Sequence, residues 1–243
     1  MCGRYNALTE DEIIEVRAII KKISLKLAKD EFKNYNETQK EVAPTNYTPV
    51  VTVNGDELAF ENGIFGFEKW DGKGVIINAR AETVHEKQMF RKYTDKNRCV
   101  VPASGYYEWK SPADEQRGKE EQSGKFLPQE QTSQTDQIEQ SKKFPPQRQK
   151  KKVKHLIKDK NGNLLFMAGL WRDGKKGKEF VIITKEPVGD VANIHDRMPV
   201  ILETDKLEAW LSGAMPIIAL ATLDHECTAA PQETEPTKQL SLF

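Results

Sequence analysis

Apolar residues near the start of the chain recur with helical spacing. Just before them, Thr9 and Glu12 form a capping-box signature, in which each side chain bonds the other residue's backbone. The apolar positions lie three or four residues apart and comprise Ile13, Val16, Ile20, Ile23 and Leu27. This spacing puts them on one helix face. The sequence therefore predicts an amphipathic helix over residues 10–29 that packs its apolar stripe on the core.

The rest of the pattern consists mainly of short apolar runs, rich in β-branched and aromatic residues. They fall at residues 50–53, 63–67, 99–109, 153–158, 164–171 and 180–184. Such runs, bounded by turn residues, are typical of strands. Because regular helices do not alternate with them, the pattern does not favour a doubly wound parallel sheet. We predict an α+β fold, with a curled, mostly antiparallel, barrel-like sheet and peripheral helices.

Two stretches lack the apolar residues that a core requires. Residues 111–152 are rich in glutamine, charge and proline, and they separate two predicted strands, so we expect a mobile low-complexity insertion. Residues 229–243 begin with a similar composition and are predicted to form a flexible C-terminal tail. A chain of 243 residues can build one sizeable core, and residues 1–228 are predicted to be a single domain.

Charge and cysteine content narrow the class of protein. Lys plus Arg and Asp plus Glu both number 37, so contact with a polyanion requires a local basic patch. The three cysteines, Cys2, Cys99 and Cys227, are odd in number and lack metal-site spacing, which favours a reducing, cytoplasmic location. Neither a signal segment nor an apolar run of membrane-spanning length is present, so no membrane association is expected.

Four stretches contain polar residues that packing alone does not require. They are CGRY at residues 2–5, INARAET at 77–83, PASGYYEWK at 102–110 and NIHDRMPVIL at 193–202. Taken singly, each has an ordinary structural interpretation. Glu108 is explained equally well as a surface charge on a strand, and His195 as a loop histidine whose hydrogen bonds are satisfied. The arginines are explained as ion-pair partners of nearby carboxylates.

Taken together, in order and spacing, the four stretches resemble the SRAP (SOS-response-associated peptidase) family, whose members process abasic sites in DNA. The resemblance covers residues 2–110 and 153–225. It implies an SRAP-like catalytic domain that binds single-stranded DNA containing abasic sites in the DNA damage response. It also implies a monomer, associated with the nucleoid in the cytoplasm, that needs no metal or cofactor and has self-peptidase and lyase activity as secondary functions.

This resemblance assigns a chemical role to Cys2. Once Met1 is removed, the α-amine of Cys2, with a pKa of roughly 7.7 to 8.0, is partly unprotonated near neutral pH. The amine can condense with the aldehyde of a ring-opened abasic sugar to give a Schiff base. The thiol can then close on the imine carbon to form a thiazolidine. An internal cysteine has no amine for this reaction, so the second position is a chemical requirement.

The resemblance implies roles for three further catalytic residues. Glu108 is expected to transfer protons, which requires a carboxyl whose pKa burial raises towards neutrality. We expect the neighbouring aromatic residues Tyr106, Tyr107 and Trp109 to supply that dry setting. Asn78 is expected to orient the sugar or the amine, and His195 to assist sugar ring opening and proton transfer.

DNA contacts are expected from arginine and aromatic side chains. Guanidinium groups suit bidentate phosphate contacts, and single strands are commonly held by aromatic platforms beside basic grooves. The residues predicted to bind phosphate are Arg4, Arg80 and Arg197, and those predicted to stack on a base are Trp70 and Phe67.

Other functions stay open on sequence alone. The family's name suggests a cysteine peptidase that uses Cys2 and His195, and such an enzyme would need only the thiol. A non-enzymatic adaptor would need neither group. The last five residues, QLSLF, resemble the peptide with which bacterial repair proteins bind the replication sliding clamp. Gln239, Leu240, Leu242 and Phe243 are the predicted clamp-binding residues, although a tail packed on its own domain fits the same pattern.

Overall fold

A computed structural model describes residues 2–23, 25–31, 39–54, 56–111 and 152–232. The larger of its two main sheets contains eight strands. In spatial order seven of them are β14 (Met198–Pro199), β13 (Gly177–Lys185), β12 (Leu165–Gly174), β9 (Arg98–Ala103), β4 (Tyr47–Asn54), β5 (Glu57–Phe65) and β2 (Lys26–Glu31). The eighth, β8 (Asn78–Arg80), pairs with β13. A parallel pairing between β13 and β5 closes β13, β12, β9, β4 and β5 into a barrel.

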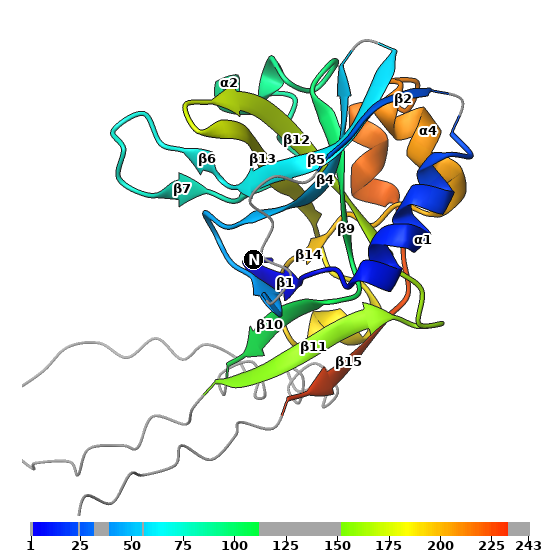
Figure 1. Ribbon diagram of the computed structural model, residues 1–243. Coiled ribbons are helices and arrows are strands. Elements are labelled where there is room, and N and C mark those ends of the chain that lie inside the picture. The colour runs from blue at the N-terminus through cyan, green and yellow to red at the C-terminus, as the bar shows by residue number, and fades with distance from the viewer. Residues whose placement is uncertain (1, 24, 32–38, 55, 112–151, 233–243) are drawn as a thin grey trace, which may run out of the picture.

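The second main sheet is antiparallel and has five strands. Their order is β15 (Cys227–Pro231), β11 (Val153–Asp159), β10 (Tyr106–Lys110), β1 (Arg4–Asn6) and β3 (Glu41–Val42). This sheet lies below the barrel in Figure 1. Pairings in both sheets are antiparallel apart from those of β13 with β5 and β8 and that of β2 with β5. The predicted α+β fold with a mostly antiparallel, barrel-like sheet is therefore confirmed.

Helices are short and lie outside the sheets (Figure 1). They are α1 (Glu10–Ile20), α2 (Gln88–Arg91) and α4 (Leu207–Leu211), with 3-10 turns η1 (Gly189–Asn193), η2 (Thr204–Lys206) and η3 (Ile217–Thr222). None of the helices in the described part of the chain is long and apolar enough to span a bilayer.

Helix α1 begins as the sequence predicts but ends earlier. The amide of Glu12 donates to the Thr9 hydroxyl at 3.3 Å, and the Thr9 amide donates to the Glu12 carboxylate at 2.8 Å. The helix ends at Ile20, and residues 26–31 form strand β2, so the predicted end at residue 29 is wrong. The segment after Ile20 alternates apolar and polar residues, a strand period, and the open edge of β5 supplies its hydrogen bonds.

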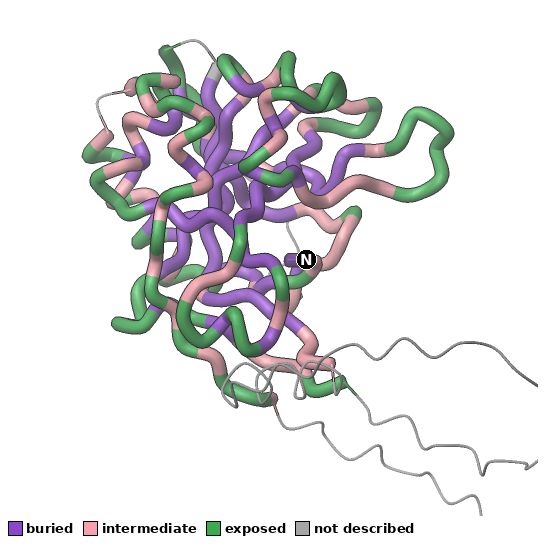
Figure 2. The backbone as a smooth tube through the Cα atoms, turned by 180° about the vertical axis from the view of Figure 1, so that it is seen from behind, coloured by how far each residue is buried: buried purple, intermediate pink, exposed green. Residues whose placement is uncertain are grey.

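Alternate residues of the central strands enter two different apolar clusters, which is the consequence of the two-residue period of a strand. Val100 and Val181 belong to the cluster that also contains the buried face of α1. Their neighbours Val101 and Ile182 belong to a second cluster that includes Cys2 and Tyr106. Figure 2 shows this buried interior running through both sheets. The second cluster is the setting of the candidate site.

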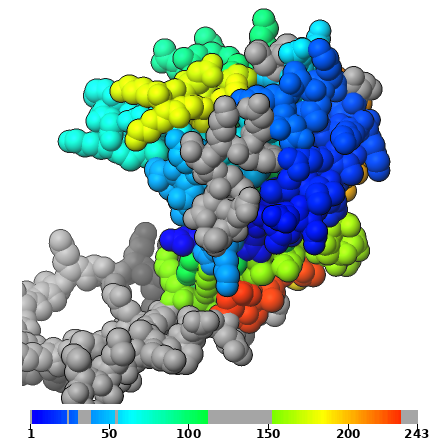
Figure 3. Space-filling model, viewed as in Figure 1, coloured from blue at the N-terminus to red at the C-terminus, as the bar shows by residue number. Residues whose placement is uncertain are grey.

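A small hairpin projects from the body of the molecule. Strands β6 (Phe67–Glu68) and β7 (Val75–Ile76) pair with each other, and β7 leads directly into β8. Figures 1 and 3 show the hairpin extending well beyond the barrel. Its base is fastened by Glu179, which accepts the amide of Glu68 at 3.1 Å, and by Arg172, which donates to the carbonyl of Glu68 at 2.5 Å.

The end of the described chain differs from the predicted domain boundary. Residues 229–231 belong to strand β15, where Ala229, Ala230 and Pro231 pair with Ile157, Leu156 and His155 of β11. The tail predicted to start at residue 229 is therefore part of the sheet at its beginning. Most of the predicted insertion at 111–152, and the predicted clamp-binding residues, lie outside the described residues.

Candidate active site

Cys2 lies where the two sheets meet. It lies two residues before Arg4, the first residue of β1, in which Arg4 and Tyr5 pair with Tyr107 and Tyr106 of β10, and it is fully buried. From the other sheet, the Asn78 side-chain amide donates to the carbonyl of Cys2 at 3.3 Å and to that of Ile182 at 3.4 Å. Asn78 can do this because β8 runs parallel to β13 with Asn78 opposite Ile182. Asn78 therefore ties the start of the chain to the barrel.

Glu108 is the buried carboxyl of the site. It lies in the middle of β10 and is 3% exposed. Burial raises the pKa of Glu108 from 4.5 to about 7, the positive charge at the chain's amino end opposes that change, and the Asp196 carboxylate adds to it. A carboxyl with this pKa exchanges protons readily near neutral pH. The expected burial and raised pKa of Glu108 are thus present, and its acid and base role stays a prediction.

His195 approaches Glu108 from the loop after η1. Its Nε2 lies 3.7 Å from Oε2 of Glu108. Its Nδ1 lies 2.7 Å from Oδ1 of Asp196 and 3.1 Å from the backbone nitrogen of Arg197. The two Nδ1 contacts require opposite protonation, since the amide of Arg197 donates while the Asp196 carboxylate accepts. The Nδ1 atom therefore has a hydrogen-bond partner whether or not it carries a proton.

The Cys2 thiol is held in its protonated form. Burial raises the pKa of Cys2 well above 9, the charge of Glu108 raises it further, and the positive charge at the chain's amino end acts in the opposite direction. Cys2 and Glu108 are therefore coupled electrostatically, and a proton on Glu108 makes ionisation of the thiol easier.

The aromatic residues around Glu108 divide between two faces of β10. Side chains alternate along a strand, so Tyr106 shares the face of Glu108 whereas Tyr107 and Trp109 occupy the other. On that other face Lys154 lies 3.8 Å from the ring centre of Tyr107. The expectation that all three rings enclose Glu108 is wrong for Tyr107 and Trp109, and only Tyr106 belongs to the same buried cluster as Cys2.

Arg197 is buried and bonded to other groups of the protein. It is 7% exposed, and its guanidinium donates to both carboxylate oxygens of Glu82 at 2.9 and 2.8 Å and to the carbonyl of Thr184 at 2.6 Å. Although burial raises the pKa of Glu82, hydrogen bonds from Arg197 bring it below its ordinary value. The assignment of Arg197 to DNA phosphates does not fit this burial. Its pairing with Glu82 fastens the His195 loop to the segment after β8, in agreement with the ordinary structural interpretation of the arginines as partners of nearby carboxylates.

The other two predicted phosphate-binding arginines reach the surface. Arg80 ends β8, two residues after Asn78, and is exposed. The Arg4 side chain is 49% exposed and forms an ion pair with Glu41 at 3.3 Å. Arg80 thus lies open to solvent on the strand that also positions Asn78.

The two predicted stacking residues have opposite environments. Trp70, in the turn of the β6–β7 hairpin, is 97% exposed. Phe67 is 1% exposed, and its ring centre lies 5.6 Å from that of Tyr93 and 4.5 Å from the Arg172 guanidinium. The Phe67 ring is therefore covered by protein, and its assignment as a base-stacking platform does not fit the structure. The exposed ring of Trp70 is compatible with that assignment.

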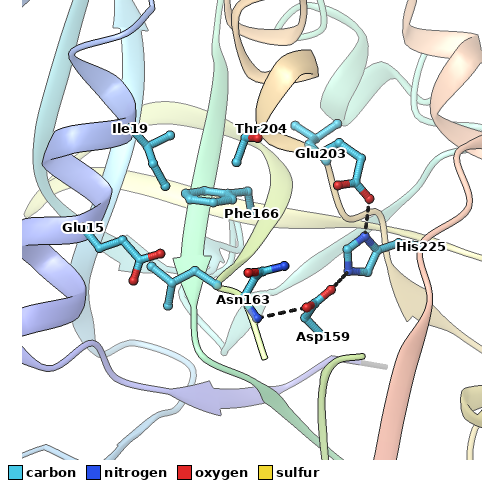
Figure 4. Close-up of a pocket in the computed structure, with 10 residues that line it drawn as sticks. Glu15, Ile19, Asp159, Asn163, Phe166, Glu203, Thr204 and His225 are labelled. Carbon is cyan, nitrogen blue, oxygen red and sulfur yellow. Dashed lines mark hydrogen bonds and ion pairs between the residues drawn. The ribbon is translucent and has the colours of Figure 1, made fainter. Parts of the chain in front are cut away.

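A separate pocket of about 190 Å³ lies beside α1 and is lined by none of the four candidate catalytic residues. Within it His225 lies between two carboxylates, with Nε2 3.0 Å from Oδ2 of Asp159 and Nδ1 2.8 Å from Oε1 of Glu203 (Figure 4). Asp159 also accepts the backbone amides of Asn161 and Asn163, both at 2.9 Å. These contacts fasten the segment before β15 to the turn after β11. Within the described residues, no group of three His, Cys, Asp or Glu side chains is arranged to hold a metal ion.

Comparisons with known proteins show which family and fold the chain resembles. The model of the family described as "SOS response associated peptidase (SRAP)" matches residues 1–133 and 143–236. Two Bacillus subtilis relatives, the abasic site processing proteins YoqW and YobE, are each 30% identical over 87% of the chain, which covers 80% and 82% of their lengths. A crystal structure of a protein from Bacteroides thetaiotaomicron has the same fold, with a TM-score of 0.61 and 22% identity, over 96% of this chain and 92% of the other.

Proposed function

The chain belongs to the SOS response associated peptidase (SRAP) family, and from this premise we propose that it captures abasic sites in single-stranded DNA covalently through Cys2. The names of its relatives support abasic-site processing as its task. The observation that carries the covalent route is the arrangement around Cys2, where Asn78 binds the Cys2 carbonyl and a buried Glu108 with a pKa of about 7 is coupled to the thiol.

The proposed reaction begins after the peptide bond before Cys2 is cleaved. The released α-amine attacks C1′ of the ring-opened sugar, and loss of water gives a Schiff base. The thiol then adds to the same carbon and closes a thiazolidine ring. Near pH 7 an α-amine is partly unprotonated, whereas a lysine amine, with a pKa of about 10.4, is almost fully charged. The amine of Cys2 is thus the better nucleophile at this pH.

Glu108 is the proton-transfer residue in this proposal. In its protonated form it can donate to the leaving hydroxyl of the carbinolamine, and in its ionised form it can accept the thiol proton. A pKa of about 7 allows both forms to be populated at neutral pH. His195, 3.7 Å from Glu108, can replace or remove the Glu108 proton between steps. The same pair can assist hydrolysis of the bond before Cys2, in which water adds to the carbonyl carbon of Met1, the C–N bond breaks, and the departing Cys2 amine takes a proton from the pair.

The DNA strand is proposed to lie along the exposed groups near β8. Arg80 is open to solvent and can contact a phosphate, and Arg4 can do the same once it leaves its ion pair with Glu41. An exposed ion pair of this kind contributes little to folding, so exchanging it for a phosphate costs little. Trp70 provides an exposed ring on which an unpaired base can stack.

The deciding experiment is a crosslinking assay. Protein lacking Met1 is incubated with a single-stranded oligonucleotide that carries one abasic site, and adducts are resolved under denaturing conditions. We expect a heat-stable adduct with the wild-type chain and none with Cys2→Ala. An intact oligonucleotide without the abasic site serves as the control. An adduct that persists in Cys2→Ala, or no adduct with the wild type, would refute the proposal.

The cysteine peptidase remains the competing function, and acetylation separates the two. Acetylation of the Cys2 amine should abolish aldehyde capture and spare a thiol-dependent peptidase. The environment of Cys2 favours capture, because cysteine peptidases depend on a thiol pKa well below the ordinary value, whereas burial and Glu108 raise that of Cys2.

We also propose that the QLSLF sequence at residues 239–243 binds the bacterial sliding clamp. Its Gln239, Leu240, Leu242 and Phe243 match the pattern of clamp-binding peptides, and tethering at the replication fork would raise the local concentration of the protein near damaged template. Titration of the chain with purified clamp tests this directly. Binding should be lost in a chain truncated after Lys238, and equal binding by the truncated chain would contradict the proposal.

A further inference from the structure

The Tyr106 hydroxyl is a buried polar group to which neither the motifs nor the proposed reaction assigns a role. Tyr106 is fully buried in β10. Among the residues that the structure describes, its hydroxyl has no hydrogen-bond partner. Buried hydroxyls are nearly always paired, because an unpaired one loses its hydrogen bonds to water without replacement. An exception close to reacting atoms therefore calls for a functional explanation.

The position of Tyr106 places it among the residues around Cys2. It lies two residues before Glu108 on β10, so the two side chains share a face of the sheet. Its partner across the ladder is Tyr5, three residues after Cys2, and all three belong to one buried cluster. Asn78, whose amide nitrogen holds the Cys2 carbonyl, also has a buried Oδ1 that is unpaired within the described part of the chain. Two unsatisfied polar atoms thus lie near Cys2.

The charges near Tyr106 determine what its hydroxyl can do. Burial raises the pKa of Tyr106 well above 10, and negative charges at Cys227, Cys2 and Glu108 raise it further. The phenol therefore keeps its proton at neutral pH and can act only as a neutral hydrogen-bond donor or acceptor. Because a negative charge on Cys2 raises the pKa of Tyr106, the phenol binds its proton more tightly when the Cys2 thiol ionises. A donor with these properties is suited to a thiolate.

We propose that Tyr106 is a catalytic residue that donates a hydrogen bond to the sulfur of Cys2 as the sulfur attacks the imine carbon. This inference rests on the proposed covalent capture and identifies a group for its second step. The Cys2 thiol resists ionisation in its buried position, so the step needs a donor that stabilises negative charge on sulfur. A hydrogen bond to a charged acceptor is about twice as strong as one between neutral groups.

The bonds and protons in the step balance. In the first stage the nitrogen–C1′ bond forms, the C1′–oxygen bond breaks, and one water leaves. In the second stage the sulfur–C1′ bond forms while the imine π pair moves to nitrogen. The thiol proton passes to that nitrogen through Glu108, and Tyr106 retains its own proton throughout. No oxidant or reductant takes part.

The test compares Tyr106→Phe with Tyr107→Phe, a matched variant on the opposite face of β10. Each Met1-free protein is mixed with abasic single-stranded DNA, and each sample is divided. One half receives borohydride, which reduces and traps the Schiff base, and the other half is denatured without it. We expect Tyr106→Phe to form the trapped adduct at the wild-type rate but to close the ring about tenfold more slowly. Tyr107→Phe should match the wild type in both measurements.

Wild-type ring closure in Tyr106→Phe would overturn this inference while leaving covalent capture intact. An absence of adduct from the wild type in both halves would instead refute the proposed function. A second variant, Cys227→Ala, tests which sulfur accepts the hydrogen bond of Tyr106. Cys227 is the alternative to Cys2, because its negative charge also raises the pKa of Tyr106. We expect this variant to retain wild-type ring closure, and a delay equal to that of Tyr106→Phe would overturn the assignment to Cys2.

Thermal unfolding separates this catalytic role from a structural one. Removal of an unpaired buried hydroxyl removes no hydrogen bond, so Tyr106→Phe should melt at the wild-type temperature or above it. A lower melting temperature, with parallel loss of the trapped and the ring-closed adduct, would show that the hydroxyl supports the fold and would overturn the inference.

Discussion

Arg197 and Arg80 both belong to motifs of the candidate site, yet their environments are opposite. Arg197 is 7% exposed and bonded to both carboxylate oxygens of Glu82, whereas Arg80 lies open to solvent at the end of β8. A buried guanidinium must be paired, because moving an unpaired charge out of water costs several kcal/mol. An exposed one is hydrated and can exchange water for a phosphate at little cost.

The same contrast separates Glu108 from Trp70. Burial raises the pKa of Glu108 to about 7, which suits proton transfer. The side chain of Trp70 is 97% exposed, which suits stacking on a DNA base. We therefore distinguish a buried set, Glu108 and Arg197 together with the Arg197 partner Glu82, whose own side chain is 36% exposed, from an exposed set, Arg80 and Trp70. Changes in the buried set should alter folding stability or chemistry, and changes in the exposed set should alter DNA affinity alone.

The largest effect is expected for Glu108→Gln. Loss of a general acid and base typically slows a reaction by roughly 10²–10⁴-fold, so adduct formation should fall by that order and lose the pH dependence that Glu108 adds, keeping only the rise with pH due to the α-amine. Rates measured between pH 5 and 8 test this, with the exposed carboxyl variant Glu86→Gln as the control. Unchanged kinetics across that range would mean that Glu108 has only a structural role and takes no part in proton transfer.

Glu108→Gln should also stabilise the protein at alkaline pH. The folded state binds the Glu108 proton more tightly than the unfolded state does, so this contribution to stability is present below pH 4.5 and is lost as pH rises through about 7. The advantage of the variant in free energy of unfolding should grow from pH 5 to pH 8 towards about 3 kcal/mol. Urea unfolding at both values measures it, and a constant difference would contradict the raised pKa.

The next effect is expected for Glu82→Ala. It leaves the buried guanidinium of Arg197 without its carboxylate, which is itself 36% exposed, and leaving a buried donor without its partner destabilises proteins by about 1 to 3 kcal/mol. Chemical denaturation measures the loss. The control is Arg80→Ala, which should change the free energy of unfolding by less than about 0.5 kcal/mol. Equal stability of the two variants would remove the distinction between the sets.

Trp70→Ala should weaken single-strand binding without altering the fold. Loss of a stacking ring costs about 1 to 3 kcal/mol per base, and the side chain is 97% exposed, so thermal unfolding should be unchanged. Fluorescence anisotropy with labelled oligonucleotide gives the affinity. The matched control is Met89→Ala, an exposed apolar residue on α2. Identical affinities for the two variants would exclude a stacking role for Trp70.

The smallest effect is expected for Arg80→Ala. One lost phosphate contact should reduce the slope of log affinity against log salt by about 0.7 for a single strand. Titrations at several salt concentrations give that slope. Lys26→Ala, an exposed cation on β2 paired with Glu57, is the control and should keep the wild-type slope. A slope for Arg80→Ala equal to that of the control would show that Arg80 does not contact phosphate.

Local pattern was sufficient for much of the fold. The capping box at Thr9 and the first turns of α1 follow from spacing alone, as do the strands around residues 50–53, 164–171 and 180–184. The end of α1 could not be predicted, because residues 23–27 suit a helix and a strand equally in local terms. The segment becomes strand β2 because it pairs with the open edge of β5, whose residues are distant in sequence. The same holds for residues 229–231, which have strand structure only because β11 pairs with them.

The sequence by itself determined which functional groups this protein has and their order along the chain. It identified the amine and thiol of Cys2, and it identified Asn78, Glu108 and His195 as the residues to examine around it. Only the tertiary structure decided which arginine and which aromatic ring are buried, and that Tyr106 lies in the same buried cluster as Cys2. The physical reason is that burial, pairing and pKa depend on neighbours through space, and here those neighbours come from segments as far apart as Glu82 and Arg197, which are 115 residues apart in the sequence.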